Sequence, residues 1–210
     1  MQELKPFRTL QTLKKALDNG GRFYNFFDRA ADDKVSRAEL ARAAGVFSAG
    51  IQAFLYLEMT KQDLSAEQQA EAVAMLEPTL RASFAKKKPP HAKPSLVDKN
   101  FKAGDGLIVT GYGRELETQK RFEGFIIVPI LVGKAMIPMM IPVNNIYQVI
   151  EIYDDEKLKS PRAIVCVPLK KKVDLAGQVQ FGGVLKELKN QTASPPTHPV
   201  YLEAIFLMKR

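Results

Sequence analysis

The sequence is poor in the residues from which disulfides, metal sites and nucleophilic centres are usually built. Its 210 residues include one cysteine, two histidines and no tryptophan. A single cysteine excludes an internal disulfide framework, and Cys166 alternates with apolar residues, as a core thiol does. His91 and His198 lie in Pro-rich stretches, and neither has a histidine or cysteine at metal-ligand spacing. We therefore predict no catalytic residue and no resident cofactor.

The sequence also lacks a long uninterrupted apolar run. The amino end contains no stretch of seven consecutive apolar residues, so as written it is not a secretory signal, and we expect a cytoplasmic protein. The most apolar segment, residues 125–143, contains three prolines and a central lysine, Lys134. Prolines break a membrane helix, and a central lysine costs about 3 kcal/mol on insertion. We predict two buried strands around a turn near residues 132–134, and no membrane span.

Positive charge is in excess but is not concentrated. The formal net charge is +8. Residues 1–97 hold 15 basic and 11 acidic groups, and residues 98–210 hold 16 and 12, so each half carries +4. A nucleic-acid-binding protein more often gathers its charge on one domain or face. The even distribution favours a charged, soluble surface over a polyanion-binding one.

The first 85 residues have helical periodicity. Leucines at three- and four-residue spacing precede Asn19–Gly20–Gly21, and further helices are predicted over residues 36–45, 48–59 and 65–85. Two of these helices begin with a capping box, Ser36 with Glu39 and Ser65 with Gln68. Pro78 is expected to end or kink the last helix.

Beyond the helices the pattern changes twice. Residues 86–99 are rich in lysine and proline and are predicted to be a semi-rigid linker. Residues 100–210 contain seven strand-like segments separated by Gly, Pro, Asn or Asp. The predicted fold class is therefore segregated α+β, with a helical domain (1–85) followed by an all-β small barrel or sandwich (100–210). The segments are residues 106–113, 124–131, 135–143, 146–153, 162–169, 178–188 and 200–208.

The acidic segment 28–39 resembles the calcium loop of the EF-hand family. That loop has twelve residues and takes side-chain oxygens from positions 1, 3, 5, 9 and 12, with glycine at position 6. The resemblance implies two helix-loop-helix units over residues 20–80. The second unit would be the one that contains the capping box of Ser65 and Gln68. The resemblance also implies these calcium ligands: Asp28, Asp32, Ser36 and Glu39.

Two departures from the EF-hand pattern weaken the implied calcium site. Ala30 stands at position 3, where it offers no oxygen, and Asp33 stands at position 6, where the sharp turn normally needs glycine. We therefore predict that the segment binds no calcium at physiological concentration. The capping box alone accounts for Ser36 and Glu39.

Two other resemblances bear on function. Residues 36–54 resemble a helix-turn-helix, with Ser48, Ala49, Gln52 and Ala53 facing outward from the second helix, but that helix has no Arg, Lys or Asn before Lys61 to read bases or bind phosphates. Residues 103–113, "AGDGLIVTGYG", are similar to the opening strand of small oligonucleotide-binding (OB) or SH3-like barrels. Such folds host many functions, so this likeness implies a fold and not an activity.

The sequence favours a non-catalytic binding protein that engages a protein or peptide partner. The first alternative is a nucleic-acid-binding protein that uses the barrel and the lysine-rich linker, with these contact residues: Lys86, Lys87, Lys88, Tyr112 and Phe181. The second alternative is a carboxylate-dependent hydrolase built on Glu115 and Glu117, which strict strand alternation would place on one face.

Overall fold

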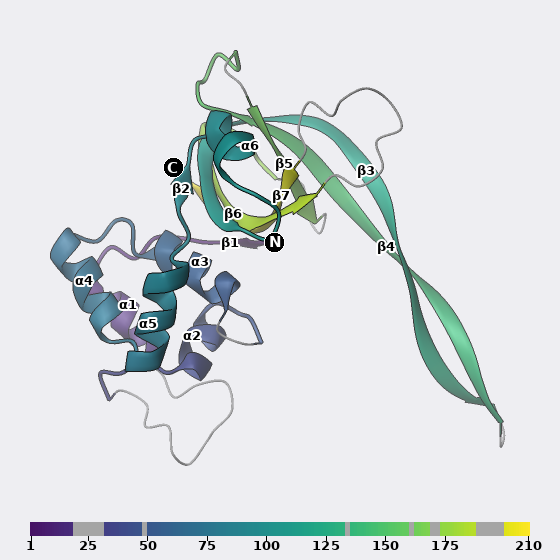
Figure 1. The fold of residues 1–210 in the computed structure, drawn as a ribbon, viewed down its shortest axis with the longest axis horizontal. Helices are drawn as coiled ribbons and strands as arrows, with labels where there is room; N and C mark the ends of the chain where they lie inside the picture. Colours follow the sequence, from purple (N-terminus) through teal and green to yellow (C-terminus); the bar gives the residue numbers. More distant parts are fainter. Residues whose placement is uncertain (19–31, 48–49, 133–134, 160–161, 169–172, 188–199) are drawn as a thin grey trace.

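The chain folds into a group of helices that packs beside a small β-barrel (Figure 1). The structure, a computed structural model, describes residues 1–18, 32–47, 50–132, 135–159, 162–168, 173–187 and 200–210, and for residues 116–147 it describes the backbone alone. The helices occupy the N-terminal half and the barrel the C-terminal half. The predicted α+β class is therefore confirmed.

In the described part of the chain, five helices precede the barrel, and two short helical turns lead into it. The capping boxes at Ser36 and Ser65 are both present, each with its reciprocal pair of hydrogen bonds. Pro78 divides the predicted fourth helix in two and occupies the first turn of the second part. No described helix is long and apolar enough to cross a bilayer. The elements are α1 (Leu10–Leu17), α2 (Arg37–Ala43), α3 (Ile51–Thr60), α4 (Ala66–Ala74), α5 (Pro78–Lys87), the 3-10 turn η1 (Pro94–Leu96) and α6 (Val97–Asn100).

Helix α3 is the centre of the helical group. Every residue from Ala53 to Thr60 is buried, which matches a helix that is apolar on most sides. One side of α3 meets the other helices, and the other side meets β3, β6 and β7 of the barrel. The helix-turn-helix hypothesis is wrong, because a helix buried along this length cannot enter a DNA groove.

The barrel is closed by five strands: β3 (Gly106–Val132), β4 (Ala135–Tyr153), β5 (Arg162–Pro168), β6 (Gln178–Glu187) and β7 (Val200–Lys209). Hydrogen bonding runs β3–β4–β5–β7–β6 and returns from β6 to β3. Neighbouring strands are antiparallel except β5 and β7, which are parallel. Two short strands are added, β1 (Gln2–Glu3) beside β7 and β2 (His91–Ala92) beside β3. Of the two predicted topologies, the barrel is the one formed.

Strands β3 and β4 are much longer than predicted. Four separate strands were expected between residues 106 and 153. The polar stretches that were expected to separate them are instead paired in the sheet, so only two long strands form. Register shifts between Glu115 and Glu117 and between Phe122 and Phe125 absorb the breaks in alternation as β-bulges. The turn predicted near residues 132–134 is confirmed, because Val132 pairs with Ala135.

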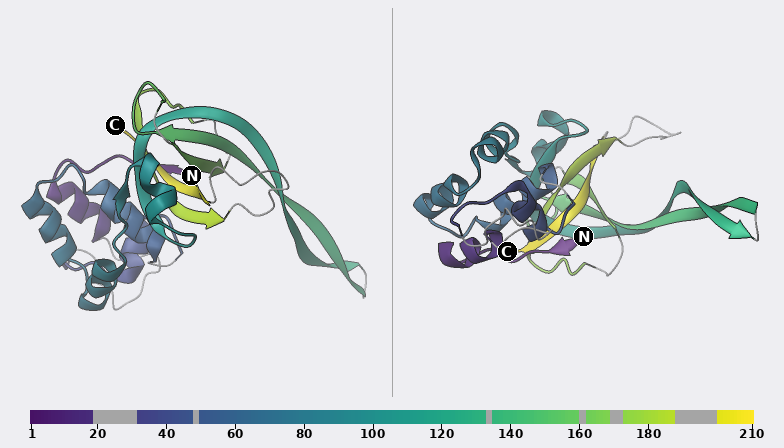
Figure 2. Two further views of the ribbon diagram at one scale, coloured as in Figure 1. Left: turned by 45° about the horizontal axis from the view of Figure 1, so that its top comes forward. Right: turned by 90° about the horizontal axis from the view of Figure 1, so that it is seen from below.

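The distal parts of these two strands form a hairpin that we call the arm, residues 120–132 and 135–146. β3 pairs with β6 only from Gly106 to Tyr112, and β4 pairs with β5 only from Tyr147 to Tyr153. Among the described strands, the arm strands therefore pair only with each other. Figures 1 and 2 show the arm extending away from the barrel and from the helices.

The predicted linker is an ordered joint. Lys86 and Lys87 complete α5, and His91 and Ala92 then pair with Ile108 and Val109 of β3. The helical and β portions also share apolar packing, because Ile108, Phe206 and Met208 of the barrel belong to the same cluster as the α3 residues. The Tyr56 ring lies 6.1 Å from the Phe206 ring. A second cluster fills the barrel itself.

We predict that Gly183→Ala destabilises the barrel. The register between β6 and β7 shifts at Gly182/Gly183, with the extra residue Ile205 in β7, and an added Cβ on Gly183 would overlap the Glu203 carbonyl oxygen. Since that atom belongs to the backbone, relief requires a shift of a strand, and we expect a loss of about 2–3 kcal/mol in urea unfolding.

The matched control is Gly50→Ala. This glycine caps α3 with an extended backbone, and an added Cβ would meet nothing within 4 Å. Its expected cost is below about 1 kcal/mol. Equal losses for the two variants would contradict the close approach of β6 to β7.

Candidate functional site

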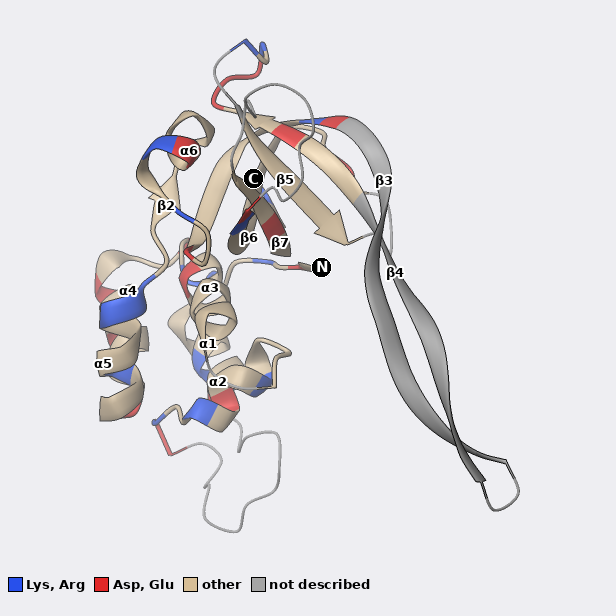
Figure 3. Ribbon diagram, turned by 45° about the vertical axis from the view of Figure 1, so that its right-hand side comes forward, with Lys and Arg blue, Asp and Glu red and all other residues tan. Residues whose placement is uncertain are grey.

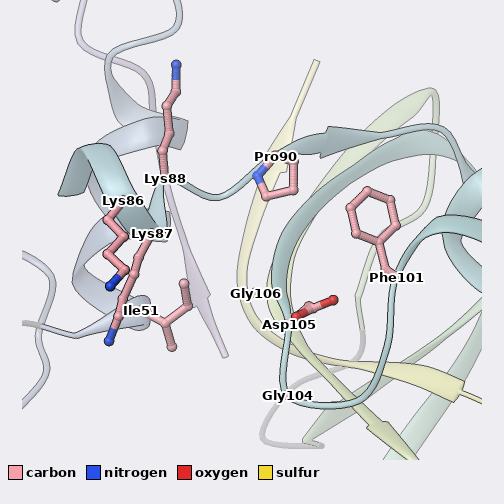
Figure 4. A pocket seen from close by; sticks show the side chains of 9 residues that line it. All are labelled: Ile51, Lys86, Lys87, Lys88, Pro90, Phe101, Gly104, Asp105 and Gly106. Carbon is pink, nitrogen blue, oxygen red and sulfur yellow. The ribbon is translucent and has the colours of Figure 1, made fainter. Parts of the chain in front are cut away.

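A cavity of about 500 Å³ lies where the helices meet the barrel (Figure 4). It opens between the C-terminal end of α5, the first residue of α3 and the segment that leads into β3. This volume is in the range of small-molecule sites. The lining residues are Ile51, Lys86, Lys87, Lys88, Pro90, Phe101, Gly104, Asp105 and Gly106.

The two sides of the cavity differ in chemistry. Lys86 and Lys87 lie on the helical side, while Phe101 and Asp105 lie on the barrel side (Figure 4). Lys86 and Lys87 are exposed and have no carboxylate partner among the residues that the structure describes. Lys88 extends away from them, and its Nζ lies 3.3 Å from Glu58 Oε1. The helical side therefore carries two lysines that have no counter-charge among the described residues.

The barrel side is fixed by a tight turn before β3. The Lys102 N–H donates to Asp105 Oδ2 at 3.0 Å, and the Asp105 N–H donates to the Lys102 carbonyl at 3.1 Å. Gly104 sits inside the turn at φ +95°, a conformation that favours glycine, and its N–H donates to the Leu185 carbonyl. Phe101 is half-buried against the barrel core. These contacts hold the Phe101 ring and the Asp105 carboxylate in place.

A buried carboxylate anchors the neighbouring joint. Glu58 of α3 is buried and lies within ion-pair distance of three bases, Lys61 Nζ at 3.1 Å, Lys88 Nζ at 3.3 Å and His91 Nε2 at 3.7 Å. Lys61 is itself buried, and its Nζ donates to Gln69 Oε1 at 3.0 Å. The cluster ties α3 to the end of α5 and to β2.

The same neighbours set the acidity of Glu58. Burial acts to raise its pKa, because the charged form loses water. His91, whose Nε2 lies 3.7 Å from Glu58 Oε1, and the charges of Lys61 and Lys88 outweigh burial, and together they hold the pKa of Glu58 below its ordinary value. Glu58 is therefore an ionised anchor, and its charge is already neutralised by the protein.

A second charged group, on the barrel, was not predicted from the sequence. Arg114 of β3 donates to Glu151 of β4 and lies 5.5 Å over the Tyr153 ring, and the Tyr153 hydroxyl donates to Glu151 at 2.8 Å. Arg114 and Glu151 are register partners, so only the strand pairing brings them together. The hydrogen bond raises the pKa of Arg114.

The hydrolase alternative relied on uninterrupted alternation between Glu115 and Glu117. The register shift falls between these two residues, so the spacing that would place both carboxylates on one strand face is broken. The Glu117 side chain lies outside the described part of the chain. We do not carry this alternative further.

The predicted calcium ligands that the structure describes already take part in hydrogen bonds within the protein. Asp28 and Ala30 lie outside the described residues. Glu39 Oε2 accepts from the Ser36 N–H and the Ser36 hydroxyl, each at 2.9 Å, and Asp32 Oδ1 accepts from the Lys34 N–H at 3.0 Å. No cluster of three or more metal-ligating side chains occurs in the described ranges.

The turn before α2 still has the sharp shape expected of position 6. Asp33 adopts φ +60°, and the N–H groups of Asp32 and Asp33 donate to the Asp18 carboxylate. Val35 bridges to Leu76 in parallel and not to Leu64, the apolar residue before the second capping box. Helices α2 and α4, which begin with the two capping boxes, are therefore not joined by a bridge between Val35 and Leu64.

The fold brings together only some of the residues that the nucleic-acid alternative requires. Lys86, Lys87 and Lys88 line the junction cavity. Tyr112 is half-buried in β3, where it pairs with Gln178 of β6. Phe181 is fully buried in the barrel core and cannot stack a base, so its proposed role is corrected. Sequence reasoning missed Phe101, whose position depends on the turn before β3.

Comparison with models of known protein families finds no match for this chain. Comparison with curated proteins also finds no match.

We predict that Glu58→Gln costs about 3 kcal/mol of unfolding free energy at neutral pH, because it leaves the Lys61 ammonium buried without its counter-charge. Since folding depresses the pKa of Glu58, its contribution is present above the ordinary carboxyl pKa of about 4.3 and is lost as the pH falls further. Urea titrations at several pH values should therefore show the two proteins converging in acid. A control, Glu156→Gln in an exposed loop, should stay close to wild type throughout.

We also predict that calcium leaves the melting temperature unchanged. Binding would require Glu39 to release the start of α2, and Asp32 to release Lys34. Differential scanning calorimetry with calcium, and with magnesium as the control ion, measures this. A rise in melting temperature with calcium alone would show that the loop is a metal site.

Proposed function

We propose that the chain is a non-catalytic binding protein whose arm inserts into an apolar cleft of a protein partner. The observation that carries this proposal is the arm itself, a two-stranded ribbon that leaves the barrel and pairs with no other described strand. An isolated two-stranded hairpin is marginally stable in water. A partner that covers it would supply the missing stabilisation.

The sequence of the arm suits burial on both faces. Residues 125–143 contain one charged residue, Lys134, and show no alternation of polar and apolar positions. A strand with one wet face alternates, whereas a strand covered on both faces has a continuous apolar run. An apolar segment of this length is typical of a surface that another molecule covers.

The edges of the arm are less suited to pairing than its faces. Pro129 and Pro138 are register partners. Because neither has an N–H, this is a non-hydrogen-bonded pair, and both proline nitrogens face the outer edges. The register is unbroken from Val132 to Phe125, so Pro142, opposite Phe125, occupies the same kind of position. Missing edge donors discourage strand addition, which favours a partner that packs on the faces.

A protein cleft accounts for the arm better than a lipid bilayer does. The outward backbone groups of a lone hairpin would be unsatisfied in hydrocarbon, at several kcal/mol each. A protein can supply donors and acceptors to these groups while it covers the apolar faces. We place this interaction in the cytoplasm, a reducing compartment that suits the single Cys166.

The barrel also supports a binding role through its topology. We propose that it is OB-like, a five-stranded Greek-key barrel in which the first two strands are β3 and β4. In OB-folds the connection between the first two strands is part of the ligand-binding region. The arm is an elongated form of that connection.

The test is a photo-crosslinking amino acid at position 127 of the full chain, introduced in the cells from which the chain derives. The matched control carries it at Glu67, on the exposed side of α4. We expect one discrete protein adduct from position 127 and none from Glu67. Excess untagged full chain should suppress the adduct, and a chain with residues 123–144 replaced by a short glycine turn should not.

Three outcomes would overturn the proposal. Lipid adducts at position 127 would assign the arm to a membrane. Adducts only to a second copy of the chain would assign it to self-association. Equal labelling at position 127 and Glu67 would show that the arm has no preferred partner.

A further inference from the structure

We propose that the cavity between α5 and the barrel binds a nucleotide unit, with its phosphate at Lys86 and Lys87 and its base against Phe101. This site is separate from the arm and does not depend on the protein partner proposed above. The ligand chemistry is a phosphate joined to a flat aromatic ring, supplied either by a free nucleotide or by a single-stranded nucleic acid.

The phosphate end is assigned by charge. Lys86 and Lys87 are adjacent exposed cations at the end of α5, and the only carboxylate among the described residues that line the cavity, Asp105, lies on the opposite side. Lys88 extends away from these two lysines toward Glu58, whose single charge also serves the buried Lys61. A bound phosphate would relieve the repulsion between the two ammonium groups.

The base end is assigned by the barrel side of the cavity. The Phe101 ring is half-buried against the core, so its position is fixed before a ligand binds. Pro90 and Ile51 add apolar surface to the same cavity. Aromatic rings stack on bases without regard to sequence, and each stacked base contributes substantially to binding.

Asp105 sets the orientation of the ligand. One of its carboxylate oxygens accepts the Lys102 N–H. Its negative charge repels a phosphate, and a carboxylate accepts hydrogen bonds from base N–H groups. The phosphate is therefore directed to the helical side and the base to the barrel side. An acidic peptide made only of Asp, Glu and small residues would place its carboxylates at the same lysines but has no flat ring for Phe101.

Fluorescence anisotropy of a labelled short single-stranded oligonucleotide on the full chain tests the site. We expect Lys86→Gln/Lys87→Gln to weaken binding by about tenfold or more, and Phe101→Leu by about tenfold. The charge-matched control is Lys157→Gln/Lys159→Gln, an exposed pair in the loop after β4 that does not line the cavity, and it should bind as wild type does. With two phosphate contacts the logarithm of the affinity should fall with the logarithm of salt at a slope of about −1.4.

Further probes separate the sources of the ligand. A free mononucleotide that competes as well as the oligonucleotide, per site, identifies a nucleotide-binding protein, and a large advantage for the oligonucleotide identifies a single-strand binder. Either result supports the site. An abasic oligonucleotide should bind about tenfold more weakly, because it cannot stack on Phe101.

The proposal fails under any of three results. Equal losses for the two lysine pairs would show only the general attraction of a protein of net charge +8. An acidic peptide of matched charge that binds as well as the oligonucleotide would assign the cavity to a peptide. Absence of binding by either nucleotide probe at low salt, with the variants folded by circular dichroism, would leave the cavity without this ligand.

Discussion

The burial of α3 between the other helices and the barrel is the contact on which the rest of the structure depends. Its apolar side chains join the helical core to β3, β6 and β7. A helix that is apolar on all sides is unstable when one side is exposed to water. The helical group and the barrel therefore have to pack against each other on opposite sides of α3. The glycines of the barrel permit this closeness, since an added Cβ on Gly106 would meet Ile51, and one on Gly182 would meet Met59.

Both candidate binding regions follow from this junction. The cavity exists because α5 ends beside the barrel, where Glu58 holds Lys88 and His91. The closed barrel, in turn, fixes the root of the arm, since β3 and β4 are paired on both sides there. One region is charged with an aromatic wall, and the other is almost wholly apolar. The two proposed ligands would therefore contact different parts of the chain.

The sequence predicts local features well and long-range ones poorly. The capping boxes at Ser36 and Ser65, the turn after Val132 and the α+β division depend on neighbouring residues, and all are confirmed. The continuation of β3 through polar residues could not be predicted, because an antiparallel partner satisfies the backbone whatever the side chains are. The positions of Phe101 and Phe181 were also out of reach. Both lie near glycines in β-like segments, and only the pairing of β3 with β6 and the turn before β3 place one at a cavity and the other inside the core.

The arm has a consequence for how fast the barrel forms. Tyr112 pairs with Tyr153 inside the barrel, where β3 is also paired with β6, so this contact between β3 and β4 spans 41 positions of the chain. The conformational search for such a contact grows with the length of the intervening chain, and non-local contacts slow folding. The pairing of Val132 with Ala135 at the arm tip converts this distant meeting into a sequence of local steps, in which each residue pair brings the next one into register. The hairpin of the arm is thus also the path by which the barrel segments of β3 and β4 come together.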